Sequence, residues 1–349
     1  MAEPVSVVMP VRDEELNLAE SVQSVLGQDY PGEVEVVLAV GPSRDRTLEV
    51  SHRLAEVDPR VTVVPNPPGH IPCAVNTAIK ASRHSVVARV DGHAVLPPGY
   101  LRAAVRELRQ TGADNVGGIM AAEGVTPFQR AVAWAMTSAF GVGAAKFHTG
   151  GRPGPVDSVY LGVYRRAAIE RVGGYDESYL RAEDWELNHR IRLAGGLIWF
   201  QPELRVTYRP RAGVRALALQ YFHYGRWRRV VARQHAGTIN PRYLAPPVAV
   251  LAMAAGLLAG LAGLGWLLSG AAGLWPAIVT CGLAVPALYA AGVAGVAVTA
   301  AGRLRLRAAG RLPVVLATMH VAWGLGFLTS PRSLMPGHPG GGRADRPPS

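Results

Sequence analysis

The pattern of apolar positions in residues 5–111 switches repeatedly between a strand type and a helix type. Runs rich in Val and Ala, typical of buried strands, occupy four segments: 5–11, 35–40, 61–64 and 85–90. Apolar residues recur at helical spacing in the segments that follow them, 14–26, 44–57, 71–81 and 97–110. Strands that alternate with helices predict a mostly parallel sheet with helices on both faces. We therefore expect an α/β fold in which the loops after the strands share one edge of the sheet.

A second pattern is a long apolar stretch in the last third of the chain. From Leu244 to Gly302, 59 residues contain no Asp, Glu, Lys, Arg or His. One helix of that length would extend about 88 Å, whereas the hydrocarbon core of a membrane is about 30 Å thick. We therefore expect an integral membrane protein in which this stretch crosses twice, with the turn near Gly270, Gly273 and Pro276. Residues 312–329 predict a third crossing, although His320 and the glycines of that segment equally suit a re-entrant or interfacial helix.

Positive charge is concentrated just before the apolar stretch. The net charge of the chain is +11, and residues 205–242 contain nine Arg and no acidic residue. A basic segment beside a membrane is typical of contact with anionic headgroups or with a phosphorylated lipid. Nucleic-acid binding is the competing explanation. Because no nucleic-acid-binding motif accompanies the basic segment, we expect no nucleic-acid partner.

The loop between the second and third expected crossings indicates the orientation of the chain. It carries four arginines, Arg303, Arg305, Arg307 and Arg311. Basic residues in short loops favour the cytoplasmic side, so we expect the α/β domain, two crossings earlier, to be cytoplasmic at the plasma membrane. The first ten residues already have a strand pattern and predict no signal peptide. The chain has only two cysteines, which excludes a disulfide framework and suits a cytoplasmic domain.

Asp91 follows the fourth predicted strand and is itself followed by Gly92 and His93. An acidic residue at the carboxyl end of a strand is where an open α/β sheet holds a ligand, commonly through a metal ion. Asp-Gly is also a favoured turn dipeptide, and the local sequence alone favours that explanation.

Glu183 and Asp184 lie in the first turn of a second candidate element, a helix that continues to about residue 194. Acidic residues at this position interact favourably with the helix dipole, and that explanation is sufficient by itself. The preceding loop contains two adjacent glycines and could bring the helix start to the ligand-binding edge. Asp184 could then act as a general base toward an attacking hydroxyl, while Asp91 would hold a divalent ion that offsets charge on a phosphate leaving group.

Taken in chain order, these features resemble family-2 glycosyltransferases, which have a GT-A (nucleotide-diphospho-sugar transferase) fold. The resemblance covers about residues 4–235. The matching motifs are the opening loop Pro10–Asn17, Asp91-Gly92-His93 in the place of Asp-x-Asp, Val116–Gly118 as a central strand, Tyr160–Arg166 as an acceptor-side turn, the Glu183-Asp184 pair, and His223–Trp227 in the place of Gln-x-x-Arg-Trp. With the late segment His320–Phe327, the architecture is similar to that of succinoglycan-type membrane glucosyltransferases.

The resemblance implies a role for each matching residue. Asp184 is expected to be the catalytic base with Glu183 beside it, and Asp91 and His93 are expected at a divalent metal, Mn²⁺ or Mg²⁺. Residues expected to bind the nucleotide-diphosphate donor are Pro10, Val11, Arg12, Glu14, Gly41, Asp45, Asp91, Arg226 and Trp227. Arg226 would help the metal to stabilise the departing diphosphate.

The chain departs from the family pattern at three places. Gly41 stands where the family usually has the first Asp of Asp-Gly-Ser-x-Asp, so the acid that commonly contacts the base is missing. His93 replaces the second Asp of Asp-x-Asp. Because a neutral imidazole ligates transition metals but is a poor ligand for Mg²⁺, we expect Mn²⁺ to support the site better. His223 replaces Gln, whereas Arg226 and Trp227 are retained.

These observations predict four parts: a cytoplasmic GT-A catalytic domain (1–212), a basic amphipathic interfacial helix (213–243), a transmembrane region of about three helices (244–330) and a disordered tail (331–349). The predicted function is inverting transfer of a sugar from a nucleotide-diphosphate donor to a membrane-associated acceptor, such as a polyprenyl-diphosphate-linked saccharide, in cell-surface or extracellular polysaccharide synthesis. Two alternatives remain open: transfer directly onto polyprenyl phosphate, and a non-catalytic relative that binds a sugar nucleotide or acts as a scaffold.

Overall fold

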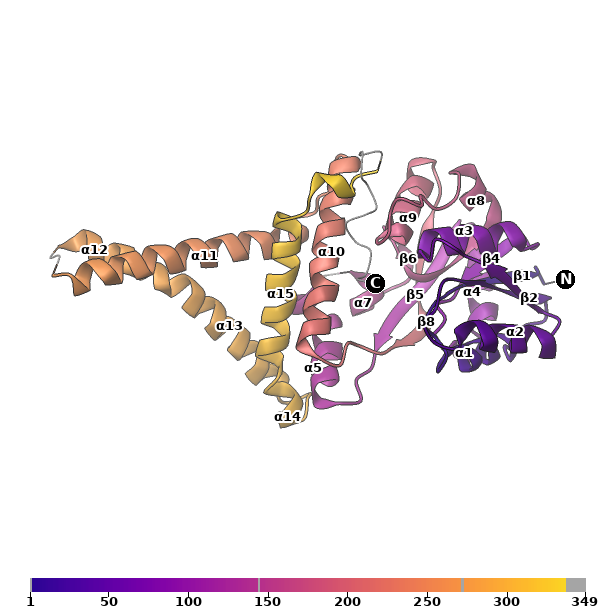
Figure 1. Cartoon of the computed structure of the whole chain (residues 1–349), viewed down its shortest axis with the longest axis horizontal. Coiled ribbons are helices and arrows are strands. Elements are labelled where there is room, and N and C mark those ends of the chain that lie inside the picture. Colours follow the sequence, from indigo (N-terminus) through magenta and orange to yellow (C-terminus); the bar gives the residue numbers. More distant parts are fainter. Residues whose placement is uncertain (1, 144, 271–272, 337–349) are drawn as a thin grey trace. The chain divides into compact units, whose positions relative to one another are not determined.

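The computed structural model describes residues 2–143, 145–270 and 273–336. Its contacts divide the chain into two compact units (Figure 1). The first contains residues 2–121 and 145–208, and the second contains residues 122–143 and 209–336. Each unit is described separately below.

The first unit is built on an eight-stranded sheet in the order β3-β2-β1-β4-β7-β5-β8-β6. Its strands are β1 (Val5–Val11), β2 (Val34–Val40), β3 (Val61–Pro65), β4 (Val86–Arg89), β5 (Asn115–Ala122), β6 (Gly154–Pro155), β7 (Tyr160–Arg165) and β8 (Ile198–Tyr208). The first four strands pair in parallel, as predicted. Antiparallel pairs join β7 to β4, β5 to β7 and β6 to β8. The sheet is therefore mixed, and Tyr160–Arg165, expected as a turn, is a strand.

Helices cover both faces of this sheet, as the alternating pattern predicted (Figure 1). They are α1 (Leu18–Leu26), α2 (Thr47–Val57), α3 (Ile71–Ala81), α4 (Tyr100–Thr111), α7 (Lys146–Thr149), α8 (Arg166–Arg171) and α9 (Glu183–Leu193). Alternate residues of β1 serve the two faces: Val7 and Met9 pack with α1 and α4, whereas Val8 packs with α3. Burial of this apolar surface on both sides of the sheet is the main stabilising contribution.

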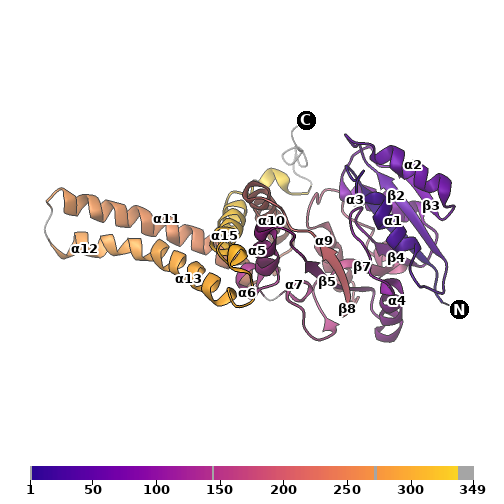
Figure 2. The same ribbon diagram turned by 90° about the horizontal axis from the view of Figure 1, so that it is seen from below.

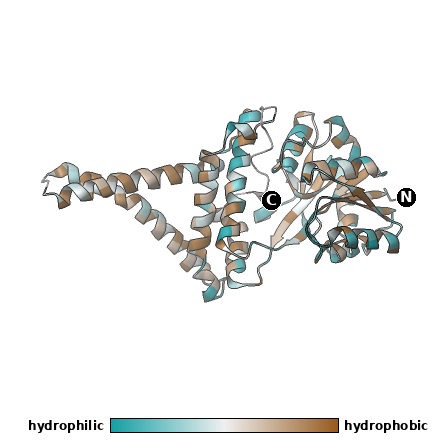
Figure 3. Cartoon of the chain, in the orientation of Figure 1, coloured by the Kyte–Doolittle hydropathy of each residue, from teal (hydrophilic) through white to brown (hydrophobic). Residues whose placement is uncertain are grey.

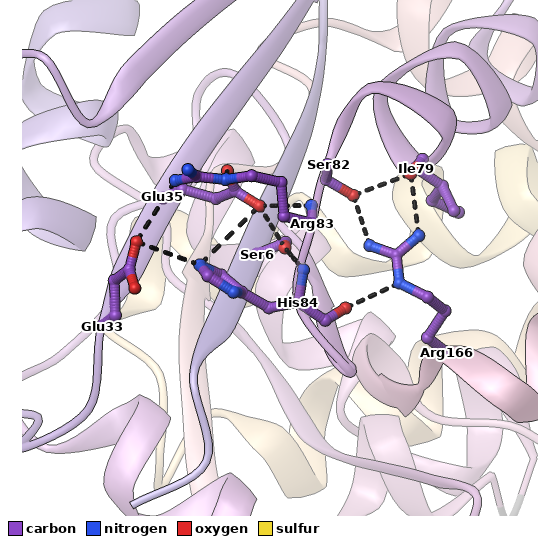
Figure 4. Close-up of polar contacts among 8 residues, drawn as sticks. All are labelled: Ser6, Glu33, Glu35, Ile79, Ser82, Arg83, His84 and Arg166. Atoms are coloured by element: carbon purple, nitrogen blue, oxygen red, sulfur yellow. Dashed lines mark hydrogen bonds and ion pairs between the residues drawn. The ribbon is translucent and has the colours of Figure 1, made fainter.

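A polar cluster closes the sheet at the amino ends of β1, β2 and β4 (Figure 4). The buried Glu35 carboxylate accepts hydrogen bonds from Ser6 Oγ at 2.6 Å and from the Arg83 backbone N–H at 2.6 Å. Arg166 donates to the carbonyl oxygens of His84 and Ile79 and to a serine hydroxyl. Each of these contacts gives a buried polar atom a hydrogen-bond partner. The cluster therefore stabilises this end of the sheet.

The second unit is helical in the part that the structure describes. Its elements are α5 (Pro127–Met136), α6 (Ala139–Val142), α10 (Val214–Gln234), α11 (Pro241–Leu268), α12 (Leu274–Thr280), η1 (Cys281–Leu283), α13 (Ala284–Ala300), α14 (Leu306–Ala309), α15 (Leu312–Leu328) and η2 (Arg332–Leu334). Gly270 and Gly273 lie between α11 and α12, as the expected turn requires, whereas Pro276 lies inside α12. Of the tail expected to be disordered, residues 331–336 include η2, and residues 337–349 lie outside the described residues.

Three helical segments of this unit are long and apolar enough to cross a membrane: Pro241–Leu268, Leu274–Ala300 and Leu306–Leu328. Hydrophobic residues predominate along them, in contrast to the polar outer surfaces of the helices on the sheet (Figure 3). The segment Leu274–Ala300 is almost entirely exposed, since only 6% of its most apolar window is buried within the protein. Such an apolar, exposed surface is what a helix presents to lipid, and the protein is therefore membrane-associated.

Helices α10 and α15 lie side by side in two perpendicular views (Figures 1 and 2), and glycines form their closest contact. A Cβ added to Gly225 of α10 would lie 2.0 Å from the carbonyl oxygen of Trp323. A Cβ added to Gly326 of α15 would lie 2.0 Å from the carbonyl oxygen of Phe222. The two backbones can approach this closely only because both positions lack a side chain.

Substitution of Gly225 by Ala should separate these helices. Because a methyl group has no room there, we expect Gly225→Ala to lower the free energy of unfolding by about 1–3 kcal/mol. Thermal unfolding of the detergent-solubilised protein, followed by circular dichroism, measures the change.

The same substitution at Gly292 is the matched control. Gly292 lies inside α13, and a Cβ there meets no atom within 4 Å. Gly292→Ala should leave stability unchanged or raise it by up to about 1 kcal/mol, because Ala favours helix more than Gly. Equal melting temperatures for wild type and Gly225→Ala would show that the helices do not pack at this point.

Candidate active site

The loops that follow β1, β2 and β4 meet at one edge of the sheet. The parallel register aligns Val11 with Val40, and the end of β4 lies beside β1, with the Val90 N–H donating to the Val8 carbonyl at 3.1 Å. The Gly41 N–H donates to the Val11 carbonyl at 2.9 Å, which fixes the second loop against the first. The edge therefore has the place that ligand sites take in open α/β sheets.

The first two loops are further tied by side chains to backbone groups. The Ser43 hydroxyl accepts a hydrogen bond from the Asp13 N–H at 3.1 Å, and Asp45 accepts one from the Glu15 N–H at 3.0 Å. Asp13 has a positive φ of 54°, an uncommon conformation for a residue with a side chain. These contacts hold Pro10, Val11 and the residues after them in one defined path.

Gly41 lies against Gly69, which belongs to the loop before α3. A Cβ added to Gly41 would lie 3.2 Å from the Gly69 Cα. Gly69 itself has φ of 69°, and its own Cβ would lie 2.9 Å from Pro42 Cδ. The Arg12 Nη1 donates weakly to the Gly69 carbonyl at 3.5 Å. This part of the edge is consequently built from backbone and the Arg12 guanidinium, without a carboxylate at position 41.

Asp91 is both a turn residue and a member of the site edge, so the two explanations for its sequence are compatible. Its carbonyl oxygen accepts a hydrogen bond from the Ala94 N–H at 2.9 Å, as a tight turn requires. Ser21 Oγ of α1 donates to the Ala94 carbonyl at 2.6 Å and stabilises this turn. The Asp91 side chain is engaged by Arg89, whose Nη2 lies 3.4 Å from Asp91 Oδ1.

Gly92 leaves space for the residues after β1. A Cβ at this position would lie 3.1 Å from Glu14 Cγ and 3.6 Å from the Pro10 carbonyl oxygen. The next residue, His93, places its Nδ1 2.7 Å from Glu14 Oε1. Glu14, Asp91 and His93 are thus close neighbours at the edge.

The Glu183-Asp184 pair is connected to this edge through Arg89. The Arg89 Nη1 lies 3.0 Å from Glu183 Oε1, and both side chains are buried. Burial, opposed by Arg89 and assisted by the nearby Asp184, raises the pKa of Glu183 to about 7. Although burial disfavours the charged form of Arg89, the Asp91 and Glu183 carboxylates raise its pKa above the ordinary value. Asp184 itself is half-buried.

The start of α9 is held in an unusual backbone conformation. Ala182, the residue before the helix, has φ of 61°, which costs energy for a residue with a Cβ. The preceding loop is clamped from two sides. Asn76 of α3 exchanges hydrogen bonds with the backbone of Tyr175, each at 2.9 Å, and Arg190 of α9 donates to the Gly174 carbonyl at 2.8 Å. The double-glycine loop thus brings the helix start to the sheet edge.

The remaining predicted residues, Arg226 and Trp227, belong to α10 in the second unit. Trp227 is buried, and the Arg226 guanidinium lies 5.4 Å from the centre of the Phe222 ring. The contacts that bring the other predicted residues together all lie within the first unit.

The side chains around Asp91 fit a metal ion that takes most of its ligands from the phosphates of a bound nucleotide. Within the residues that the structure describes, no three His, Cys, Asp or Glu side chains are grouped as metal ligands, and Asp91 Oδ2 has no hydrogen-bond partner. Glu14 beside His93 reproduces the carboxylate–imidazole pairing that orients metal-binding histidines. The protein can thus supply one or two ligands, with phosphate oxygens for the rest.

Arg89 was missed as a site residue by the sequence reasoning, which treated it as part of a strand. A signal was present, because residues two apart in a strand point to the same face and Arg89 stands two positions before Asp91 in an otherwise apolar run. Tyr164 and Tyr175 were also missed. Burial raises the pKa of both hydroxyls, so both side chains are neutral.

Comparison with known proteins gives consistent results. Residues 6–173 match the model of the family described as glycosyl transferase family 2. The succinoglycan biosynthesis protein ExoA of Rhizobium meliloti is 34% identical over 257 residues, which are 73% of this chain and 78% of that protein. The uncharacterized glycosyltransferase EpsJ of Bacillus subtilis is 29% identical over 113 residues, which are 32% of this chain and 33% of that protein.

A solved structure that covers almost the whole chain was also found. It is the mannosyltransferase PcManGT from Pyrobaculum calidifontis in complex with GDP-Man and Mn²⁺, with a TM-score of 0.58 and 21% identity, covering 93% of this chain and 87% of that one. The likeness confirms the expected GT-A fold.

The buried Glu183 predicts a pH-dependent contribution to stability. Its pKa in the folded protein, about 7, lies above the ordinary value of 4.5, so the folded state binds the extra proton between these two values. The stability of wild type relative to Glu183→Gln should therefore fall as the pH rises from about 4.5 to about 7 and then level off. Chemical unfolding of both proteins at a series of pH values measures this difference. A difference that rises with pH would contradict the direction of the shift.

Proposed function

The chain belongs to glycosyl transferase family 2, and from this premise we propose that it is an inverting glycosyltransferase acting on a nucleotide-diphosphate sugar. The observation that carries the proposal is the convergence of Asp91 and the Glu183-Asp184 pair on Arg89 at the carboxyl edge of the parallel strands. Similarity to a succinoglycan biosynthesis protein supports a place in polysaccharide synthesis.

In the proposed reaction, Asp184 takes the proton from an acceptor hydroxyl. The hydroxyl oxygen forms a bond to the anomeric carbon of the donor while the bond from that carbon to the nucleoside diphosphate breaks. A single displacement of this kind inverts the configuration at the anomeric carbon. Glu183 stays beside the base, held by Arg89, and Asp184 remains half-buried where a hydroxyl group can approach it.

A divalent metal at Asp91 and His93 would supply positive charge that offsets the developing charge of the departing diphosphate. PcManGT, whose fold this chain shares, was solved with GDP-Man and Mn²⁺, which supports the proposal. Pro10, Val11, Arg12, Glu14, Gly41 and Asp45 line the same edge and are proposed to bind the nucleotide. On the family motif, Arg226 and Trp227 are also proposed as donor-binding residues.

The acceptor is proposed to be membrane-associated, with a polyprenyl-diphosphate-linked saccharide as the best candidate. Arginines on α10 stack on aromatic rings: Arg228 lies 4.3 Å from the Tyr243 ring and Arg229 lies 4.8 Å from the Phe327 ring. Such amphipathic pairs suit the interface between headgroups and acyl chains. We propose that residues 1–212 form a cytoplasmic catalytic domain, 213–243 the interfacial helix and 244–330 three crossings of the plasma membrane, followed by a disordered tail (331–349).

Two other readings use the same residues. Transfer directly onto polyprenyl phosphate would need the same base and donor site, and the lipid product distinguishes it. A non-catalytic relative that binds a sugar nucleotide or scaffolds other proteins is motivated by Gly41 and His93, which depart from the family pattern.

Replacement of Asp184 tests the proposed reaction. Native membranes are supplied with a panel of nucleotide-diphosphate sugars, and donor consumption and labelled lipid products are measured. We expect Asp184→Asn to lower turnover by at least about a hundredfold, because an amide cannot accept the proton.

Asp58→Asn is the matched control, since Asp58 ends α2 and pairs with Arg60 on the surface. It should transfer sugar at the wild-type rate. If wild-type membranes consume no donor above the Asp184→Asn level, the enzyme proposal is wrong and a binding or scaffolding role replaces it.

The choice of metal tests the role of His93. Because imidazole binds Mn²⁺ better than Mg²⁺, we expect wild-type activity to be at least about fivefold higher with Mn²⁺. His93→Ala should narrow this ratio, whereas His52→Ala, on the exposed face of α2, should not. Equal activity with both ions, or activity without either, would refute the assignment.

A further inference from the structure

Arg89 joins two parts of the chain that are far apart in sequence. It is 8% exposed, and its guanidinium lies 3.4 Å from Asp91 Oδ1 and 3.0 Å from Glu183 Oε1. Asp91 lies in the loop after β4, whereas Glu183 is the first residue of α9. One side chain therefore contacts both the acid on the proposed donor side and the helix turn that carries the proposed base.

The fold does not require a charge at this position. The other residues of β4, Val86, Val87 and Ala88, are buried and apolar. A buried ion pair loses so much hydration that an apolar replacement of both partners is often neutral or stabilising. The presence of a buried arginine in the centre of the sheet is therefore better explained by the two carboxylates it contacts than by stability.

Arg166 shows what a structural arginine looks like in this protein (Figure 4). Its guanidinium donates to the carbonyl oxygens of Ile79 and His84 and to Ser82 Oγ at the opposite ends of the strands. These are backbone acceptors and a hydroxyl, which need a donor but carry no charge. Arg89 instead lies between two carboxylates.

We infer that Arg89 is a positioning residue that holds Asp91 and Glu183 in one mutual arrangement for sugar transfer. One arm of the guanidinium fixes Glu183, and with it the first turn of α9 and Asp184. The other arm contacts Oδ1 of Asp91 at 3.4 Å and limits the orientation of that carboxylate. This inference rests on the proposed function and assigns Arg89 no contact with substrate.

The charge of Arg89 also affects the affinity of the site for cations. The guanidinium opposes a divalent cation near Asp91, because like charges repel across short distances. Its removal leaves the carboxylates uncompensated, so a divalent cation should bind more tightly although transfer becomes slower. Removal of a residue that served only the fold would instead lower both the transfer rate and the affinity for the cation.

The test uses the full-length protein in detergent with five variants: Arg89→Gln, Arg89→Lys, Glu183→Gln, the double variant Arg89→Gln/Glu183→Gln, and the control Arg166→Gln. The donor KM and kcat are measured with the donor found for wild type. Binding of Mn²⁺ alone is measured separately by electron paramagnetic resonance, and thermal unfolding reports on the fold.

We expect Arg89→Gln to lower kcat at least about tenfold, since a misplaced base costs one to two orders of magnitude, while the donor KM changes less than about threefold. Mn²⁺ should bind about threefold or more tightly than to wild type. Arg89→Lys keeps the positive charge but lacks the two N–H arms of the guanidinium. It should have the wild-type Mn²⁺ affinity and only part of the wild-type kcat. The double variant should lose no more activity than Glu183→Gln alone, because the two residues act as one unit. Arg166→Gln should lower the melting temperature without altering Mn²⁺ affinity.

The inference would be overturned if the kcat losses of the two single variants multiply in the double variant. It would also be overturned if Mn²⁺ binds Arg89→Gln no more tightly than it binds wild type. If wild type consumes no donor, the proposed function fails, while the Mn²⁺ titration still decides whether Arg89 opposes a cation at Asp91.

Discussion

The buried contact between Arg89 and Glu183, with 3.0 Å between Nη1 and Oε1, joins two separate elements at the candidate site. The pair links elements of very different rigidity. Arg89 ends β4, which is hydrogen-bonded to β1 on one side and to β7 on the other. Glu183 follows Ala182, whose positive φ is strained, and a loop that depends on Asn76 and Arg190 for its shape. The arrangement of the candidate site therefore depends on one ion pair that ties a strained helix start to a fixed strand.

The fold was predictable wherever a run of apolar residues was bounded by residues that end a strand or a helix. The bounds of β1 and α3 agree with the predicted segments, because alternation of buried strands with amphipathic helices leaves few other solutions. The first helix was expected from residue 14 but begins at Leu18. Side chains of the neighbouring loop, Thr47 and Asp45, bond to the backbone N–H groups of Glu14 and Glu15 instead. The antiparallel half of the sheet left no comparable pattern, since strands and helices no longer alternate one for one after β5.

The candidate site was predictable in its location and not in its connections. The parallel strands predicted that Pro10, Gly41 and Asp91 would share an edge, and the structure places them there. Contacts across the fold, such as Arg89 with Glu183 or Glu14 with His93, depend on side chains from separate elements. No periodicity along the chain encodes these pairs. The close approach of α10 to α15 was missed for the same reason, because Gly225 and Gly326 are meaningful only when both helices are seen together.

The contact between Gly41 and Gly69 limits how the loops of the candidate site can change. A side chain at position 41 would press on the Gly69 backbone at 3.2 Å, and Gly69 is itself confined by Pro42 and a left-handed φ. A larger residue at position 41 would therefore need a shift of the loop that carries Gly69. The two loops are sterically coupled, so a substitution in one can be accommodated only together with a change in the other.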